Sequence, residues 1–342
     1  MIRRLTLHGT FDGTTAWLHG YDRVMKRIIL ILLALAAQVT AANETISVAA
    51  STKGTLFDQA GTAVAKVATN NGKLQSTVRN YTSANVFAPA IARGQVDFGV
   101  ANQYEIMLAM TGQSYFEGRG QPNLRAVAVL FPLRIATYVR LDSPVRRIAD
   151  LRGHRMPDGY VANKIILPLI DATLAAEGLT RTDVVALNVP GLVGGADAFM
   201  SGRTEGFLFA LRSPKVREAN ARHGIRALPL DNTPETLAAI RQHMPVAYFA
   251  LEEPHPSNPG IVEPTWVIAY DTLLFASTDT SDEVVYRMTR TLFENKQALV
   301  AASPAFRLFS EDAMAKDLGL LEYHSGAIRF YKEQGLWPPT DQ

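Results

Sequence analysis

The chain of 342 residues contains no cysteine and carries almost no excess of charge. Without cysteine, a disulfide framework and a thiol nucleophile are both excluded. The 34 lysines and arginines nearly balance the 32 aspartates and glutamates, whereas domains that bind nucleic acid are usually strongly basic. We therefore expect no nucleic-acid partner. Hydrophobic residues make up 47% of the chain, so the composition is that of a globular protein long enough for two domains.

Catalytic and metal-binding motifs are missing as well. The sequence has no Gly-x-Ser-x-Gly elbow, no His-Glu-x-x-His helix and no phosphate-binding glycine loop. Its histidines lack the spacing of a metal site. We interpret the protein as a monomeric binding protein, not an enzyme, with no cofactor and no metal. An exported hydrolase and a ligand-sensing module for a signalling partner remain alternative interpretations.

No apolar run is long enough to cross a membrane, and the most apolar one lies near the N-terminus. Ile28–Ala37 is a run of roughly ten residues, the length of a signal-peptide core. A basic start at Met25–Arg27 precedes it, and small residues for cleavage follow at Val39–Ala41. These features predict a signal peptide over 25–42, an upstream mis-start over 1–24 and a periplasmic mature protein. An uncleaved anchor or a buried helix is the alternative.

The first stretch of the mature chain predicts a strand, a polar loop and a helix. Ile46–Ala50 is apolar and β-branched, Ser51–Gly54 is polar, and helical spacing of apolar residues begins at Thr55. A helix start presents free N–H groups and the positive end of the helix dipole, which suits a carboxylate. An ordinary first βα unit without a ligand fits the same pattern.

Two more loops repeat this arrangement. Tyr81–Asn85 follows a strand-like run, and Asn102–Tyr104 follows the short strand that ends at Ala101. In an open parallel sheet the carboxyl ends of the strands lie together, and ligands bind there. The middle third of the chain repeats the alternation of strand and helix, which predicts a second α/β lobe. A Pro-rich segment over Pro254–Pro264 separates this lobe from the C-terminal part. Local patterns also predict two strand pieces over Leu124–Arg140 with a break at Pro132–Arg134, a loop over Arg155–Tyr160 and one amphipathic helix over Ser281–Leu299.

Short segments in a characteristic order span nearly all of the predicted mature chain: Ala50–Thr55, Gly94–Gln103, Ile148–Gly153, Ala176–Leu179, Val284–Met288, Leu292–Asn295 and His324–Tyr331. In this order they resemble the TAXI family, the periplasmic solute receptors of certain TRAP transporters. The resemblance implies an α/β, two-lobed periplasmic-binding-protein-like fold (type II), with hinge strands and a ligand cleft between the lobes. It also implies a small organic acid as ligand, with a C4–C5 carboxylate favoured, and the membrane subunits of a TRAP transporter as partner.

On this basis we expect lobe I over 43–138 and lobe II over 139–260. The hinge return and the C-terminal helices, which we expect to pack on lobe I, then occupy 261–342. The sequence departs from the family pattern in two loops. Lys53 stands where a small residue is usual, and Asp158–Asn163 replaces the Gly-Ser-Gly-Thr loop of the second lobe. A divergent subfamily with a different carboxylate is consistent with these departures.

The candidate ligand-binding residues lie in the loops, near the predicted strand crossing and on the second lobe. We predict that they are Thr52, Lys53, Tyr81, Thr82, Ser83, Asn85, Asn102, Gln103, Tyr104, Arg134, Tyr160, Asn163 and Phe209. Lys53 could pair with a carboxylate, and Arg134 could do so through the two parallel bonds that a guanidinium makes; each could equally be a surface cation. The second loop could serve only to cap a helix, and lone aromatics such as Tyr160 and Phe209 are more often core residues.

Overall fold

The first strand and helix form where the sequence predicts them. β1 (Glu44–Ala50) is buried from Ile46 onward. α2 (Leu56–Gly72) begins after Thr55, whose side chain accepts a hydrogen bond from the Asp58 N–H, and it ends at Lys73 in the left-handed conformation. The structure, a computed structural model, describes residues 44–162 and 166–339. The predicted mis-start and signal peptide and the candidate Asn163 lie outside the described residues.

The strands form a large mixed sheet and a small parallel pair. The large sheet runs in the order β2-β1-β3-β10-β4-β7, and β8 and β9 pair with β4 and β10 respectively. Its other strands are β2 (Leu74–Asn80), β3 (Phe98–Asn102), β4 (Leu124–Arg140), β7 (Gly206–Ala210), β8 (Ile225–Ala227), β9 (Tyr248–Glu252) and β10 (Thr265–Ser277). The small pair is β5 (Arg155–Asp158) with β6 (Val185–Asn188). β1 and β3 are parallel, whereas β10 is antiparallel to β3, β4 and β9.

Helices follow most of the strands. They are α3 (Ala84–Ala92), α4 (Gln103–Thr111), α5 (Leu167–Ala175), α6 (Leu192–Met200), α7 (Pro214–His223), α8 (Pro234–Arg241), α9 (Asp282–Glu294), α10 (Lys296–Ala302) and α11 (Ser325–Glu333). Short 3₁₀ helices occur over Ser114–Phe116, Ile148–Leu151, Arg181–Asp183 and Pro304–Leu308. Within the described residues, no helix is both long and apolar enough to cross a membrane.

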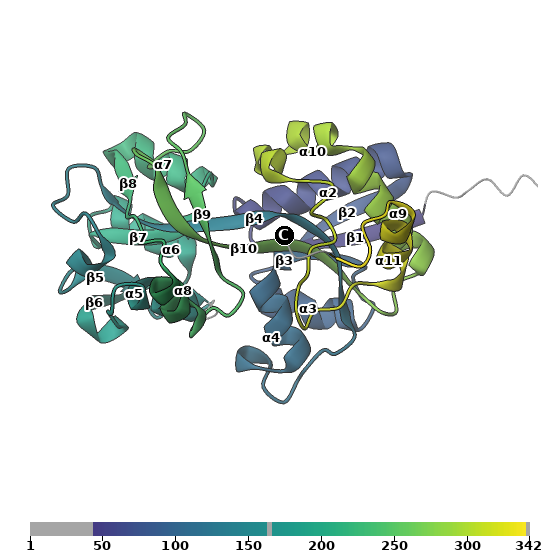
Figure 1. The fold of residues 1–342 in the computed structure, drawn as a ribbon, viewed down its shortest axis with the longest axis horizontal. Helices are drawn as coiled ribbons and strands as arrows, with labels where there is room; N and C mark the ends of the chain where they lie inside the picture. Colours follow the sequence, from purple (N-terminus) through teal and green to yellow (C-terminus); the bar gives the residue numbers. More distant parts are fainter. Residues whose placement is uncertain (1–43, 163–165, 340–342) are drawn as a thin grey trace, which may run out of the picture. The chain divides into compact units, whose positions relative to one another are not determined.

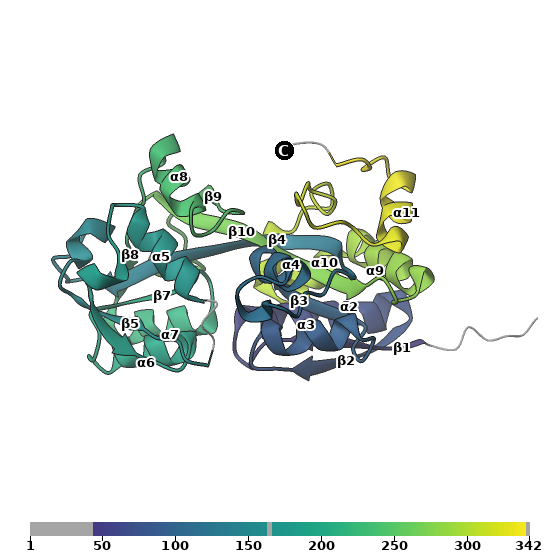
Figure 2. The same ribbon diagram turned by 90° about the horizontal axis from the view of Figure 1, so that it is seen from below.

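Two long strands connect two α/β lobes, as the sequence predicts. The antiparallel pairing of β4 with β10 begins where Ile135 lies opposite Ile268 and ends where Leu124 lies opposite Ser277. Figures 1 and 2 show both strands running from one lobe into the other. Lobe I contains β1–β3, α2–α4 and the C-terminal helices α9–α11, of which α9 packs against α2 and α11. Lobe II contains β5–β9 and α5–α8.

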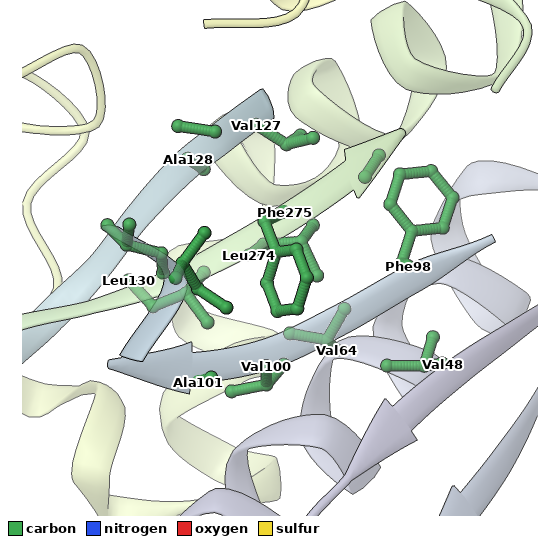
Figure 3. Close-up of a cluster of buried hydrophobic side chains, with 14 of the residues drawn as sticks. Val48, Val64, Phe98, Val100, Ala101, Val127, Ala128, Leu130, Leu274 and Phe275 are labelled. Atoms are coloured by element: carbon green, nitrogen blue, oxygen red, sulfur yellow. The ribbon is translucent and has the colours of Figure 1, made fainter. Parts of the chain in front are cut away.

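The core of lobe I lies around the β3 and β10 pair. Figure 3 shows Val48 of β1, Val64 of α2, Phe98 of β3 and Phe275 of β10 among the buried side chains there. Separate apolar clusters fill lobe II on the two sides of its strands. Because most buried apolar side chains of each lobe pack within that lobe, the two lobes can move against each other at the connecting strands while most of each core stays buried.

Three local predictions were wrong. β4 is one strand through Pro132, where the sequence predicts a break. β7 and β8 pair with β4 only from Ile135 onward, so at Pro132 the strand pairs with β10 on one side only, and a proline is tolerated there. The single helix predicted over Ser281–Leu299 is two helices, because the backbone leaves the helical conformation at Asn295. The loop predicted over Arg155–Tyr160 begins with β5.

Candidate functional site

A cavity of about 480 Å³ lies where loops of both lobes meet the connecting strands. Lobe I contributes Ser51, Thr52, Thr55, Leu56, Phe57, Thr82, Asn102, Tyr104 and Glu105; the connecting strands contribute Leu133, Ile135 and Tyr270; lobe II contributes Ala162, Ile166, Leu169, Pro190–Gly194, Asp197, Leu208–Ala210 and Met244. Most of these side chains are apolar, and a few polar groups stand among them. Pockets for small molecules have this composition and this range of volume.

The first polar loop reaches the cavity through its hydroxyl groups. Ser51, Thr52 and Thr55 line the cavity. The loop is tied to the second one because the Tyr81 N–H donates to the Ala50 carbonyl at 2.9 Å. Lys53 is exposed and is not among the residues that line the cavity. Its ammonium group therefore does not stand where we expected it to meet a carboxylate.

The second polar loop contributes a single residue, Thr82, to the cavity. Tyr81 packs its ring on Phe87, with the ring centroids 5.6 Å apart. Ser83 is buried at the start of α3, and its hydroxyl donates to the Asn85 side chain. Tyr81, Ser83 and Asn85 do not line the cavity, and the Ser83 side chain makes no capping hydrogen bond to the backbone of α3.

The third loop places a buried carboxyl group on the cavity wall. Asn102 caps α4 by accepting from the Glu105 N–H at 2.9 Å, and its own amide donates to Glu105 Oε2 at 2.6 Å. Glu105 is 6% exposed, and this burial raises the pKa of its carboxyl to about 7. Tyr104 lines the cavity beside it, whereas Gln103 points to the Leu318 carbonyl at 3.3 Å.

The second lobe meets the cavity with a glycine-rich helix start. α6 begins after Gly191, which has no side-chain hydrogen bond to cap the helix, and its first turn contains no acidic residue. The first N–H groups of an α-helix have no acceptor inside the helix, and here Gly191–Gly194 line the cavity. Asp197 also lines it, but Lys215 neutralises this carboxylate at 2.9 Å.

The remaining candidates divide between wall and core. Phe209 lines the cavity from β7. Tyr160 does not: it is 1% exposed and lies inside lobe II, where it lines a second, smaller cavity with Pro157 and Leu174. Arg134 is also absent from the lining, because its guanidinium pairs with the buried carboxylate of Glu252. Glu252 is held by Arg212 and Asn258 as well, so it takes the cation that we expected to meet a ligand.

Thr52, Thr82, Asn102, Tyr104 and Phe209 are therefore the predicted site residues that the structure brings together. Glu105 and the start of α6 are among the parts of the cavity wall that sequence reasoning missed. The signals were present, since Glu105 stands three residues after a helix cap and Pro190–Gly195 contains three glycines. Among the described lining residues there is no lysine, arginine or histidine. Nor does the described part of the chain gather three side chains that could hold a metal ion.

The two α/β lobes, the connecting strand pair and the cavity between the lobes define the chain as having the fold of periplasmic binding proteins. The chain belongs to the NMT1-like family, whose sequence profile matches residues 48–335.

Solved structures agree with this fold. An R. palustris protein with adipate is 14% identical, with a TM-score of 0.52, over 77% of this chain and 87% of that one. MatC from Rhodopseudomonas palustris, with bound malate, is 14% identical, with a TM-score of 0.50, over 77% and 88% of the two chains. A periplasmic transporter is 15% identical, with a TM-score of 0.51, over 87% and 95%. At these identities the likeness is one of fold.

Proposed function

We propose that this protein is an extracytoplasmic solute-binding receptor that captures a small organic acid and delivers it to a membrane transporter. The observation that carries the proposal is the cavity between the lobes, where hydroxyl groups of the first loop and the uncapped start of α6 meet across apolar walls. Helix N-termini bind carboxylates without a cationic side chain, through free N–H groups and the helix dipole. The cavity can therefore hold an acid although no cation is among its described lining residues.

Receptor function needs no bond breaking, only a difference in affinity between two states. Rotation of the lobes at β4 and β10 would bring the Thr52 loop and the α6 start against the same ligand. The closed form then binds the ligand more tightly than the open form, and the ligand shifts the population toward closure. The transporter would recognise this closed form, so import would begin only with a loaded receptor.

The finer parts of the proposal rest on the resemblance in sequence. The resemblance to the TAXI family implies a C4–C5 carboxylate as the ligand and the membrane subunits of a TRAP-type transporter as the partner. Two of the similar structures were solved with organic acids, adipate and malate, which supports testing acids first. The signal peptide predicted from the sequence supports a periplasmic location for the receptor.

A thermal-shift screen of the purified full chain tests this function. The panel contains mono- and dicarboxylates of three to eight carbons, amino acids, and neutral sugars. A ligand that binds only the folded form raises the melting temperature by mass action. We expect a rise with a group of related acids and none with sugars. A rise with sugars alone, or with no compound of the panel, would contradict the proposed function.

A further inference from the structure

Glu105 is a buried acid on the wall of the cavity, and its position is fixed. It occupies the first turn of α4 and is 6% exposed. The amide of Asn102 holds Oε2 at 2.6 Å, and no other hydrogen bond of its side chain occurs within the described residues. Oε1 is therefore left for a ligand in the cavity that Glu105 lines.

Among the described residues that line the cavity, no side chain offers Glu105 a positive charge. From β10, Tyr270 faces it with a buried hydroxyl whose pKa is raised by burial and by the Glu105 charge. The next residue of β10, Asp271, is bonded to Lys316 at 2.8 Å and to Tyr248 at 2.7 Å.

On the helices that border the cavity, Tyr104 is a second weak acid whose pKa is raised by burial. Asp197 of α6 already has Lys215 as its partner. An ionised Glu105 would therefore be a buried charge without a counter-ion among the described residues, which is costly, so the neutral carboxyl is favoured.

A neutral carboxyl group does what a carboxylate cannot: it donates. An O–H donor facing a ligand carboxylate makes a short, charge-assisted hydrogen bond. The second oxygen of the same ligand carboxylate remains for the N–H groups at the start of α6 or for the hydroxyls of the first loop. The two lobes could thus share one carboxylate when they close.

The described part of the wall favours a ligand with a single charge. Leu56 and Phe57 of lobe I, Leu133 and Ile135 of β4, and Leu169 and Leu208 of lobe II are apolar. A second carboxylate would have to lie among these side chains, and no lysine, arginine or histidine is present among the described lining residues to neutralise it. An apolar ligand body, by contrast, gains from burial there.

Building on the proposed function, we propose that the neutral Glu105 carboxyl selects the ligand: it donates a hydrogen bond to the carboxylate of a singly charged organic acid with an apolar body. The proton on Glu105 is then part of the bound complex. Because the ligand's negative charge further disfavours ionisation of Glu105, binding takes up a proton at pH values where the free site is ionised. Affinity should fall as the pH rises through the range in which free Glu105 ionises.

Calorimetric titration tests the inference with two matched sets of acids. Isovalerate, isocaproate and phenylacetate carry one charge on an apolar body, and succinate, glutarate and adipate carry two charges. At pH 6 we expect the best singly charged acid to bind at least tenfold more tightly than any of the dicarboxylates. Between pH 7 and pH 9 the affinity for this singly charged acid should fall as the pH rises. The fall should not exceed about tenfold per pH unit, which is the limit for one coupled proton.

Variants separate the role of Glu105 from other causes of pH dependence. Glu105→Gln keeps a neutral hydrogen-bond donor, so it should bind the same acid with an affinity that no longer depends on pH between 6 and 9. Glu117→Gln, the same change on an exposed side chain, should keep the wild-type profile. Circular dichroism tests whether the variants fold. If Glu105→Gln does not fold, the pH dependence of the wild-type affinity and the comparison of the two sets of acids still test the inference.

The outcomes distinguish this inference from the proposed function. An acid that binds with pH-independent affinity, or more tightly as the pH rises, overturns the inference and leaves the receptor function standing. So does a dicarboxylate that binds more tightly than all the singly charged acids. If no acid binds at any pH, the proposed function fails first, and the inference falls with it.

Discussion

Asn102 shows how one side chain can serve both the fold and the site. Its oxygen caps α4, and its amide fixes the carboxyl group of Glu105 on the cavity wall. Asparagine is a favoured cap residue, so the pattern Asn-x-x-Glu has a structural explanation that is sufficient by itself. For this reason sequence reasoning could place Asn102 near the cavity but could not assign a role to Glu105.

The buried carboxyl of Glu105 should make stability depend on pH. Its pKa is about 7 in the folded protein, against an ordinary value of 4.5. Between these values the folded chain binds more protons than the unfolded chain, so the free energy of unfolding falls as the pH rises. Glu105→Gln removes this loss, and at pH 8 it should be more stable than wild type by up to ~3 kcal/mol.

Urea unfolding at pH 4.5 and pH 8 measures the effect. The difference between Glu105→Gln and wild type should be near zero at the lower pH and appear only at the higher one. Glu117→Gln controls for the loss of a carboxylate elsewhere on the protein. An equal difference at both pH values would mean that Glu105 does not titrate as its burial implies.

Arg134 should matter for stability and not for affinity. Its guanidinium bonds the buried Glu252 carboxylate, which keeps Arg212 and Asn258 when Arg134 is removed. Arg134→Met should therefore destabilise the fold by about 2 kcal/mol, the range of a hydrogen bond to a charged group, and leave acid binding within about twofold. Urea unfolding measures the stability of this variant, and calorimetry measures its acid affinity. Arg307→Met, the same change on an exposed side chain, is the control. A large loss of affinity at unchanged stability would instead show that Arg134 contacts the ligand.

At the scale of elements, the start of α6 is a helix terminus left without a cap. Gly191 is extended, with φ of −172°, and a Cβ there would meet no atom within 4 Å. Gly191→Asp can therefore cap the helix, and it should raise the free energy of unfolding by about 0.5 kcal/mol. The same carboxylate would occupy the N–H groups proposed for the ligand, so we expect acid binding to weaken at least tenfold.

The matched variant Gly191→Asn adds a neutral cap of nearly the same shape. It should stabilise α6 to a similar extent and weaken binding less than Gly191→Asp, because its amide oxygen competes for the same N–H groups but adds no like charge. Urea unfolding and calorimetric titration of both variants give the two numbers. Unchanged acid affinity in Gly191→Asp would exclude the start of α6 from the binding site.

Elements with strong local signals were predictable, and the others depended on tertiary pairing. β1, α2 and the three polar loops follow from short-range patterns of apolar and polar residues. The continuity of β4 through Pro132 does not, because it depends on β10 pairing along the whole strand. The cavity wall divides in the same way. Thr52 and Thr82 stand in polar loops that can be read from the sequence, whereas the position of Gly191 against lobe I is set by the fold.

At the scale of the whole molecule, two lobes that are joined by β4 and β10, and that each keep most of their core within the lobe, permit closure on a ligand. Binding should then stabilise the folded chain as a whole, by about 2.7 kcal/mol at a ligand concentration one hundred times Kd. Urea unfolding of the wild type with and without the best acid measures this gain. Gly191→Asp serves as the control, since the same ligand concentration should stabilise it far less. Equal gains in both chains would place the binding site outside the cavity.

A crystal structure of the chain with the acid that raises its melting temperature most is the most direct test of the receptor function. We expect the ligand in the cavity between the lobes, with its carboxylate at the start of α6 and within hydrogen-bond distance of Glu105, and with its apolar body against Leu133 and Leu208. A ligand bound elsewhere on the protein, or one whose carboxylate contacts neither α6 nor Glu105, would contradict the site described here.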